Sequence, residues 1–445
     1  MKKRLLYISA LSGVLLLSGC NSEEEPQTDN ETAGGHEDHI EEMEELHEDH
    51  MGDGHGSHED HGEGHGEHHS ESTAEEIKAE AGEETGTFNE RAADGLLVSQ
   101  TKNITRIEEN ELEDLSIAVS QTIWPSTHEE NQPGTVIMVP EDHWQVALAG
   151  LNLVHHPNDG PALFTGSDSI SDSVLAEIER LQPKGNEDGT EVIVMGDVDE
   201  NVLDQLNGYE TEHITAETPA AFAAKIDEAY AEVTGNITEN IIIGSLEDED
   251  QTLTSIAGHW IAHMEEGLLY VAENEIPSET IEALEKREGE ANIYVLGSET
   301  IISEEVADQL GEYGNVERME GESPAELSVE FAQFRDEENE FGWGIDEPGH
   351  GLTFVSTNTP ELAIPGAAFA HLGKHTPLIW LEEGELGEEM YEYFSLLKPV
   401  FENDPMEGPY NHGYVLGTFE DISFQTQGII DEKLEIEGLH GHGGH

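Results

Sequence analysis

Three segments of this chain repeat one order of sequence elements, at a spacing of about 100 to 110 residues. Each segment opens with a short apolar run, continues with apolar residues spaced i, i+1 and i+4, and closes with a second apolar run that ends in glycine. Such runs predict buried strands, and the spaced pattern predicts a helix with one buried face. The period is too long for a solenoid unit, so the sequence predicts three copies of a small α/β domain. The segments are Gly160–Gly196, Glu266–Gly297 and Thr376–Gly417.

Strands and helices alternate throughout the region that holds these segments. In the first copy the patterns predict helix Leu112–Trp124, strand Val136–Val139 and helix Trp144–Val154. This alternation is typical of a parallel sheet covered by helices on both faces. We therefore expect an α/β protein with three tandem parallel-sheet repeat domains. The expected boundaries are 1–19 for a signal peptide, 20–95 for a tether, 96–210, 211–314 and 315–436 for repeats 1, 2 and 3, and 437–445 for a His-rich tail.

The first nineteen residues have the pattern of a signal peptide. A basic start precedes an apolar stretch of about thirteen residues, which is too short to span a bilayer core. Small residues then lead to Cys20, the only cysteine in the chain, in an arrangement that resembles the lipobox of bacterial lipoproteins. The resemblance implies cleavage before Cys20 and a lipid on its sulfur that anchors the chain to the cell membrane. The alternative is an ordinary secretory signal with an incidental cysteine.

Residues 20–95 are predicted to form a disordered, acidic, histidine-rich tether. Most of this segment has hardly any aromatic or β-branched residues, so it cannot bury enough apolar surface to offset its ordering entropy. Residues 74–84 have the composition of a short helix, although nothing in the sequence requires one.

Histidines recur about every three residues in this tether, interleaved with Asp and Glu. Neutral imidazole is a good ligand for Zn²⁺ and Ni²⁺, and carboxylates can complete a coordination sphere. We expect weak binding of divalent metal ions here, and no cofactor that the repeats require. The alternative is a solvated tether whose histidines contribute only charge. The predicted ligands are His36, His39, His47, His50, His55, His58, His61, His65, His68 and His69.

Histidines also fall near the same helix C-terminus in all three repeats. Two interpretations stay open for them: imidazolium groups that complement the helix dipole, and a ligand site that the repeats share. Pairs spaced i, i+4 would offer a metal two ligands, but no acidic base lies inside the first pair as a metalloprotease requires. The equivalent histidines are His155/His156, His263 and His371, and the pairs are His259/His263 and His371/His375, unless Gly373 ends the second helix.

The chain carries 99 Asp and Glu against 17 Lys and Arg, a net charge of −82. Such a charge repels nucleic acid and anionic lipid headgroups, so neither is an expected partner. Because strand and helix patterns persist through the acidic region, we interpret the charge as a folded surface adapted to high salt.

Several motifs of the first repeat carry a family resemblance: Asn103–Ile107, Ala118–Gln121, Asp142–Trp144, Pro157–Thr165, Glu177–Pro183 and Val192–Gly196. They resemble the type-2 cell-wall-binding repeat family of Gram-positive surface proteins, over roughly residues 100–435. The resemblance implies three open α/β domains around a pseudo-threefold axis, holding a protein non-covalently on anionic wall polymers. The family's Arg-Tyr-x-Thr-Ala signature is missing: Arg106 and Arg318 remain near it, and repeat 2 has only Ile214-Thr-Ala216.

No enzyme signature stands out. The sequence has no Gly-x-Ser-x-Gly elbow and neither of the glycine-rich phosphate-binding motifs. We expect a non-enzymatic, lipid-anchored protein on the extracytoplasmic face of a Gram-positive cell membrane, which binds a cell-wall polymer at residues that the sequence does not identify. The alternatives are an extracytoplasmic zinc or nickel buffer or metallochaperone, and an enzyme that uses the crevice at the strand C-termini. Arg106, Lys184, Arg318 and Lys374 are the few cations predicted near loops or strand ends.

The charge predicts a stability that depends on salt. Self-repulsion among the acids weakens the compact state, and salt screens it, with a Debye length of ~10 Å at 0.1 M and ~3 Å at 1 M. The melting temperature should rise by roughly 10 °C or more between these concentrations of NaCl, measured by circular dichroism. Sucrose at matched osmolality is the control, and an equal rise in sucrose would remove the argument for an adapted surface.

Overall fold

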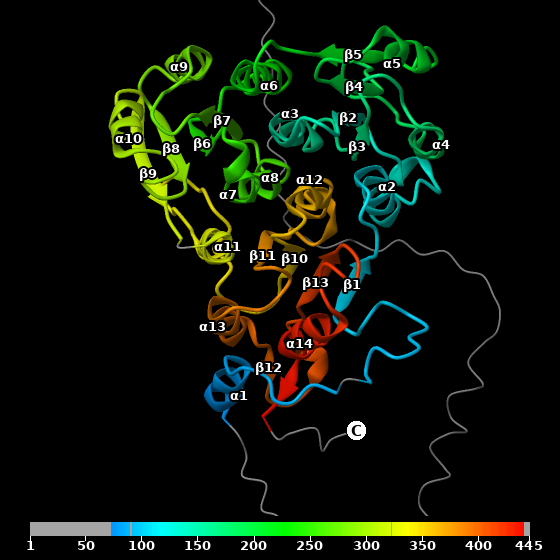
Figure 1. Ribbon diagram of the computed structural model, residues 1–445, viewed down its shortest axis with the longest axis vertical. Helices are drawn as coiled ribbons and strands as arrows, with labels where there is room; N and C mark the ends of the chain where they lie inside the picture. The colour runs from blue at the N-terminus through cyan, green and yellow to red at the C-terminus, as the bar shows by residue number, and fades with distance from the viewer. Residues whose placement is uncertain (1–72, 90, 322, 440–445) are drawn as a thin grey trace, which may run out of the picture. The chain divides into compact units, whose positions relative to one another are not determined.

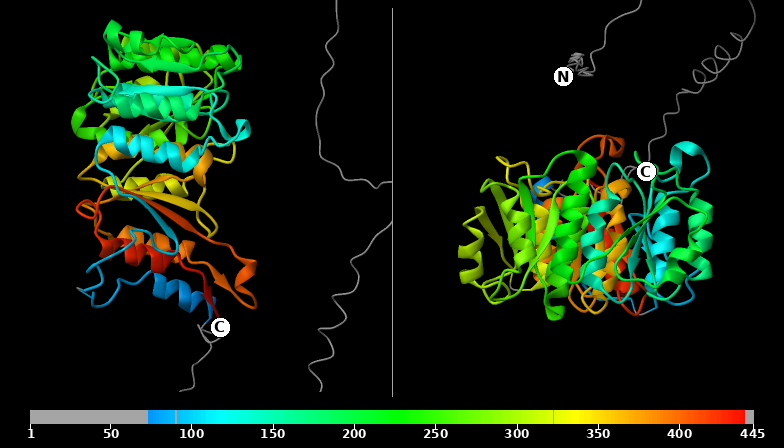
Figure 2. Two further views of the ribbon diagram at one scale, coloured as in Figure 1. Left: turned by 90° about the vertical axis from the view of Figure 1, so that its right-hand side faces the viewer. Right: turned by 90° about the horizontal axis from the view of Figure 1, so that it is seen from above.

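The computed structural model describes residues 73–89, 91–321 and 323–439 (Figure 1). The predicted signal peptide, Cys20 and most of the tether lie outside these residues. The described part holds three four-stranded sheets, and every strand pair in them is parallel. Helices pack against each sheet (Figures 1 and 2). The predicted α/β fold of three repeated parallel-sheet units is confirmed.

The three sheets share one strand order. Half of their strands are buried along their whole length, because helices cover them, and this explains the near-continuous apolar runs of those strands. Sheet 1 is β3 (Ala162–Thr165), β2 (Val136–Pro140), β4 (Val192–Met195) and β5 (Thr211–Ile214). Sheet 2 is β7 (Gly267–Val271), β6 (Asn240–Ser245), β8 (Ala291–Leu296) and β9 (Gly314–Met319). Sheet 3 is β11 (Leu378–Leu381), β10 (Gly351–Ser356), β13 (His412–Leu416) and β1 (Ile104–Ile107). A small extra sheet pairs β12 (Val400–Phe401) with β14 (Glu437–Gly438).

The helices follow the strands in the same order in each repeat. Repeat 1 has α2 (Leu112–Ile123), α3 (Trp144–Gly150) with the 3-10 turn η2 (Leu151–Val154), α4 (Asp172–Leu181) and α5 (Glu200–Gln205). Repeat 2 has α6 (Pro219–Thr234), α7 (Gln251–Thr254), α8 (Ile256–Ile261), α9 (Ser278–Glu285) and α10 (Glu304–Leu310). Repeat 3 has α11 (Pro324–Gln333), α12 (Ala363–Gly366), the π-turn η5 (Phe369–Gly373), α13 (Glu388–Leu397) and α14 (Phe424–Leu434).

Each sheet takes its fourth strand from the next repeat of the chain. β5 opens repeat 2 but joins sheet 1, and β9 opens repeat 3 but joins sheet 2. β1, at the start of the described repeats, pairs with β13 near their end, with Arg106 opposite Val415. The three repeats are therefore linked in a closed cycle, and sheet 3 closes it by joining the first strand of the described repeats to strands near their end.

A basic side chain fixes each exchanged strand. Arg106 of β1 donates from Nη1 to Gly417 O at 2.8 Å, Arg318 of β9 donates from Nη1 to Gly297 O at 2.8 Å, and His213 of β5 donates from Nε2 to Gly196 O at 2.8 Å. All three glycines have positive φ and end the neighbouring strand, so the same contact recurs at each junction. Arg106 and Arg318 lie near the position of the missing Arg-Tyr-x-Thr-Ala signature, and His213 takes their place in repeat 2. These three side chains thus join the repeats.

Arg106 makes the most extensive of these contacts. It is 2% exposed, and it also donates to Thr418 O, Ile422 O and Gln427 Oε1 at 3.0, 2.7 and 2.7 Å. Its guanidinium carbon lies 4.4 Å from the centre of the Phe419 ring, and burial lowers its pKa to about 10. It is therefore not available to a polymer at the surface.

Short helices meet where the repeats come together. α3 packs on α6, α7 on α11 and α12 on α2, and α8 contacts η2, α12 and η5. Gly258 of α8 allows the close approach, because a Cβ there would lie 2.8 Å from Leu148 Cδ1 and 3.1 Å from Leu151 Cδ1 of repeat 1. One hydrophobic cluster therefore reaches into all three repeats, and a second cluster lies around sheet 3.

Part of the predicted tether is helical. α1 (Ala74–Ala81) has a capping box formed by Thr73 and Glu76, and it packs on α13 with Ile77 and Ala81 buried. Lys433 of α14 donates from Nζ to Glu80 O and Glu83 O at 3.3 and 3.1 Å. The prediction of disorder up to residue 95 is therefore wrong for α1, because a face of two small or apolar side chains is enough to dock a short helix on a large neighbour.

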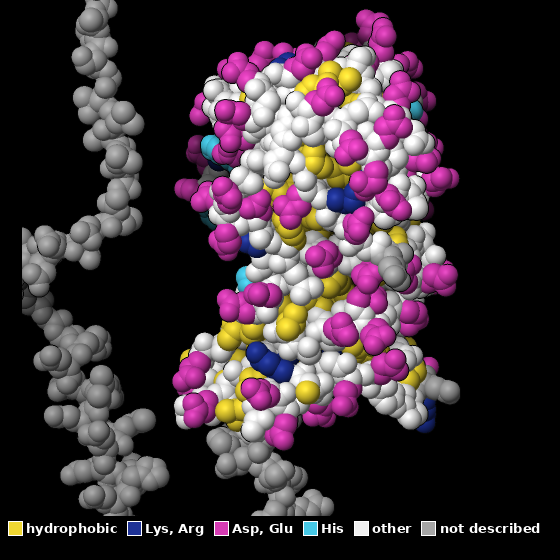
Figure 3. Space-filling view, turned by 90° about the vertical axis from the view of Figure 1, so that its left-hand side faces the viewer, with side chains coloured by type: hydrophobic (Ala, Val, Ile, Leu, Met, Phe, Trp, Pro, Cys, Tyr) yellow, Lys and Arg dark blue, Asp and Glu magenta, His cyan; other side chains and the backbone are white. Residues whose placement is uncertain are grey.

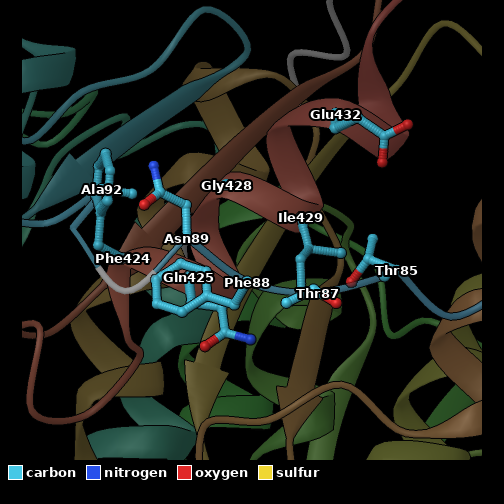
Figure 4. Close-up of a pocket in the computed structure, with 11 residues that line it drawn as sticks. Thr85, Thr87, Phe88, Asn89, Ala92, Phe424, Gln425, Gly428, Ile429 and Glu432 are labelled. Atoms are coloured by element: carbon cyan, nitrogen blue, oxygen red, sulfur yellow. The ribbon is translucent and has the colours of Figure 1, made fainter.

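The segment after α1 crosses α14 and leaves a shallow pocket of about 330 Å³ (Figure 4). Phe88 and Asn89 line it from the N-terminal segment, and Phe424 and Ile429 from α14. The pocket therefore lies between the segment after α1 and α14 of repeat 3, and none of its described lining residues comes from repeat 1 or repeat 2.

The junction predicts a large effect for Arg106→Met. The change leaves buried carbonyl oxygens without donors, so we expect the free energy of unfolding to fall by about 3 kcal/mol. Arg106→Lys should recover only part of this, because an ammonium lacks the planar fork of donors. Urea unfolding followed by circular dichroism measures both, with the exposed Lys184→Met as control. Equal effects of Arg106→Met and Lys184→Met would contradict the role given to the strand junction.

Candidate functional site

Equivalent histidines end the central helical segments of the three repeats. His155, His263 and His371 follow one another at intervals of 108 residues. The sequence placed them near one helix C-terminus in each repeat, and the structure brings them to the place where the repeats meet. The rings of His155 and His371 lie 5.1 Å apart, centre to centre, in an edge-to-face arrangement with 67° between their planes. The ring of His263 lies 4.9 Å from that of His375 in repeat 3.

The His155 and His371 pair is tied to its surroundings by hydrogen bonds. His371 Nε2 lies 2.9 Å from Asp159 Oδ1, and His155 Nδ1 lies 3.2 Å from the hydroxyl of Tyr230. The hydrogen bond with His371 lowers the pKa of Asp159 to about 2. Burial, helped by the neighbouring His371, lowers the pKa of His155 to about 4. The pair therefore connects repeat 1 to repeats 2 and 3 with an uncharged His155 at neutral pH.

His263 lies flat against an indole. Its ring stacks on Trp343 with 5.0 Å between ring centres and 7° between the planes. Its Nδ1 atom lies 3.4 Å from Nδ1 of His375. His375 is exposed and has a left-handed backbone, φ +54°, because η5 ends at Gly373. His371 and His375 are therefore not an i, i+4 pair on one helix.

His259 cannot act with His263 as a pair of metal ligands. Helix α8 ends at Ile261, before His263. His259 is fully buried, and its Nδ1 and Nε2 atoms lie 3.0 Å from Thr376 O and 3.3 Å from Ala363 O. Both carbonyls belong to repeat 3, so His259 holds two repeats together and has no ring nitrogen left for a metal.

A polar pocket of about 640 Å³ opens beside this cluster and is lined by all three repeats. Repeat 1 contributes His155, and repeats 2 and 3 contribute carboxylates, amides and a few apolar side chains at the N-terminal ends of the strands. None of the described residues that line it is Lys or Arg. The lining consists of His155, Asn236, Ile237, Thr238, Glu239, Asn240, Met264, Glu265, Glu266, Asn292, Glu338, Asn339 and Glu340.

Asn240 holds the wall of this pocket together. Its Nδ2 atom donates to Glu266 Oε1 at 3.1 Å and to Asn339 O at 2.9 Å, and its Oδ1 accepts from Asn292 Nδ2 at 3.0 Å. The network therefore joins three strand ends of repeat 2 to the first loop of repeat 3. It fixes the loop that carries Glu338 and Glu340.

Glu266 is the buried carboxylate of the pocket, 5% exposed. Burial raises its pKa, although the hydrogen bond from Asn240 opposes this. Within the described residues, its Oε2 atom and the indole Nε1 of Trp260 have no hydrogen-bond partner. The indole lies close enough to favour the charged carboxylate but not in hydrogen-bonding geometry. The pocket thus presents hydrogen-bond acceptors suited to hydroxyl or ammonium donors.

The sequence-predicted ligands lie elsewhere. His36, His39, His47, His50, His55, His58, His61, His65, His68 and His69 are outside the described residues, as are Cys20 and residues 440–445. In the described ranges, no group of three or more His, Cys, Asp or Glu is arranged to hold a metal ion. None of the helices in the described part is both long and apolar enough to cross a membrane.

Comparison with known proteins identifies the fold. No model of a protein family matches the sequence, and no curated protein matches it. Among solved structures, Cwp6 from Clostridium difficile matches with a TM-score of 0.59 and 14% identity, over 75% of this chain and 48% of that chain. Cwp8 from Clostridium difficile matches with a TM-score of 0.58 and 17% identity, over 75% of this chain and 52% of that chain. The chain thus spans about half the length of these proteins.

The buried state of His155 predicts a stability that depends on pH. Its folded pKa of about 4 is below the ordinary value of 6.5, so the unfolded chain binds the proton first as the pH falls. The folded state therefore loses stability between pH 6.5 and 4, by on the order of 1 kcal/mol at pH 5 after allowance for partial exposure. His155→Gln should lose less stability than the parent between pH 7 and 5 in urea unfolding. The exposed His128→Gln is the control, and a parent-like loss in His155→Gln would contradict the prediction.

With these histidines and the adjoining pocket placed, the likeness to Cwp6 and Cwp8 shows that this chain has the fold of a part of those proteins.

Proposed function

We propose that this protein is held at the cell surface and binds a cell-wall polymer, without catalysis, through its three repeats. The observation that carries the proposal is the pocket lined by all three repeats in a fold found in two cell wall proteins. The lipid on Cys20 would supply the attachment to the membrane, and the tether would supply the reach. The lipid and the tether are predictions from the sequence.

The charge of the surface decides how such a polymer is held. Acidic side chains spread over the face drawn in Figure 3, and Lys and Arg are few there. Of the cations that the sequence placed near loops, Arg106 is buried, and Arg318 bonds to Gly297 O. A strongly anionic polymer would therefore be repelled at low salt.

Hydroxyl groups suit the pocket better than anionic groups do. Carboxylates and amide oxygens accept hydrogen bonds from sugar hydroxyls, and the amide nitrogens of the asparagines donate to ring and hydroxyl oxygens. We infer that the pocket takes a hydroxyl-rich segment of the polymer, while salt or divalent cations screen the acids around it. Attachment at more than one place on a repeating polymer would add avidity.

A second candidate function is an extracytoplasmic zinc or nickel buffer. The ten tether histidines favour it, since their spacing gives many imidazoles within reach of one ion. This function needs no contribution from the pocket, so the two candidates are separable by experiment.

The test is sedimentation of residues 21–445 with lipid-free cell walls. Retention on the walls should be low at ~0.05 M NaCl and rise at least severalfold at ~1 M NaCl or with Mg²⁺ or Ca²⁺. A basic protein would show the opposite dependence, because salt releases it from an anionic polymer. Retention under none of these conditions would end the proposal and favour the metal buffer.

Variants of the pocket locate the binding surface in the same assay. Glu265→Ala with Glu338→Ala removes two exposed acceptors from the rim, and we expect at least a fivefold loss of retention at high salt. The matched control is Glu179→Ala, an exposed acid of repeat 1 outside the pocket. Increased retention in the double variant would mean that the pocket repels the polymer, and the site would then lie elsewhere.

A further inference from the structure

We propose that His263 and His375 form a two-imidazole site for a borderline divalent metal ion, Cu²⁺, Ni²⁺ or Zn²⁺, at the junction of repeats 2 and 3. The site is separate from the tether histidines and from the carboxylates of the polar pocket. The proposal does not depend on the binding of a wall polymer.

The distance between the two ring nitrogens carries the proposal. His263 Nδ1 and His375 Nδ1 are 3.4 Å apart. Two imidazole nitrogens that bind one metal at ~2.0–2.1 Å with a tetrahedral angle lie ~3.4 Å from each other. A hydrogen bond between the two rings is the competing explanation, but 3.4 Å is long for one. The pair is therefore spaced for an ion between the rings.

The surroundings keep His263 in its uncharged form. Burial lowers the pKa of His263 to about 4, with His375, His155 and His371 adding to the effect. The His263 nitrogen is therefore unprotonated at neutral pH, and an unprotonated imidazole is the form that binds metal. Trp343 fixes the plane of the His263 ring by stacking on it.

The remaining coordination positions of the ion would be open. Because the described residues hold no group of three or more metal-binding side chains, only two ligands come from the folded repeats. Water or a small anion would complete the sphere. We expect modest affinity and a preference for imidazole-seeking metals over Mg²⁺ or Ca²⁺, which take oxygen ligands.

The two indoles beside His263 report on this site alone. The ring centre of Trp343 is 5.0 Å from that of His263, and that of Trp260 is 6.0 Å away. A Cu²⁺ ion bound there quenches their fluorescence, whereas ions on the tether histidines add only a background that the variants share. A comparison of the quenching in the parent and in the variants therefore distinguishes ions bound at His263 and His375 from ions bound to the ten histidines of the tether.

The experiment titrates residues 21–445 with CuCl₂ at pH 7.5 and follows tryptophan emission. The parent should show saturable quenching that EDTA reverses, and His375→Ala should lose at least four fifths of the part that exceeds the background measured with residues 34–70 deleted and His375 replaced by Ala. The exposed His128→Ala is the matched control and should behave as the parent does. His375 is exposed, so its replacement should leave the fold intact, which circular dichroism checks.

A second measurement uses ZnCl₂, which does not quench. Binding to the folded state alone raises the melting temperature, so excess Zn²⁺ should raise that of the parent by a few degrees and that of His375→Ala by much less. Trp343→Phe should lose part of the quenching, because Trp260 remains beside His263, but keep the shift. Equal quenching of the parent and His375→Ala would overturn the proposal, as would a parent that shows neither quenching nor a shift.

Discussion

The structure depends on the strand that each repeat gives to its neighbour. In a parallel sheet the fourth strand supplies a full ladder of hydrogen bonds, and here that ladder crosses from one repeat to the next. For sheet 3 the donor is β1, more than 300 residues before its partner β13. Loop closure over such a length costs entropy that grows only slowly with length. The hydrogen bonds of the β1–β13 pairing and the buried contacts of Arg106 offset this loss of entropy.

The closed cycle explains why the central contacts hold their geometry. The two ring nitrogens of His259 lie 3.0 and 3.3 Å from carbonyl oxygens of repeat 3, and Asn152 of repeat 1 donates to Glu266 O of repeat 2 at 3.0 Å. Such contacts need fixed distances between repeats. The strand exchange supplies them at the outer end of each repeat, and the shared core supplies them at the centre. The histidine cluster and the polar pocket lie where these constraints meet.

The positions of the helices and strands could be predicted from the sequence more readily than the pairing of the strands and the packing of the helices. In repeat 1, the predicted helix Leu112–Trp124 and strand Val136–Val139 differ by one residue from α2 and β2. Periodicity and proline positions are local signals, and they mark where an element begins and ends. Sheet membership is not local: nothing in Asn103–Ile107 shows that its partner is His412–Leu416. The short apolar face of α1 is likewise visible only against α13.

The candidate site was predictable in part, for the same reason. The equivalence of His155, His263 and His371 follows from the repeat itself, and their convergence follows from the cyclic arrangement. His375 could not be joined to His263 from sequence, because the left-handed turn after Gly373 decides where its ring lies. The pocket was missed because its residues come from strand ends of different repeats. The adjacent pairs Glu239-Asn240 and Glu265-Glu266, each directly before a predicted strand, were the available signal.

Four of the cations in the described part of this acidic chain lie in its interior. Arg106, Arg287, Lys398 and Lys433 are each 5% exposed or less. Arg287 donates to both carboxylate oxygens of Asp227 at 3.0 and 2.7 Å, and Lys398 donates to Glu432 O at 3.1 Å. Cations used in this way cannot offset the acids at the surface. Because these four cations are buried, the polymer binding proposed above would rest on hydrogen bonds, with dissolved ions screening the acids at the surface.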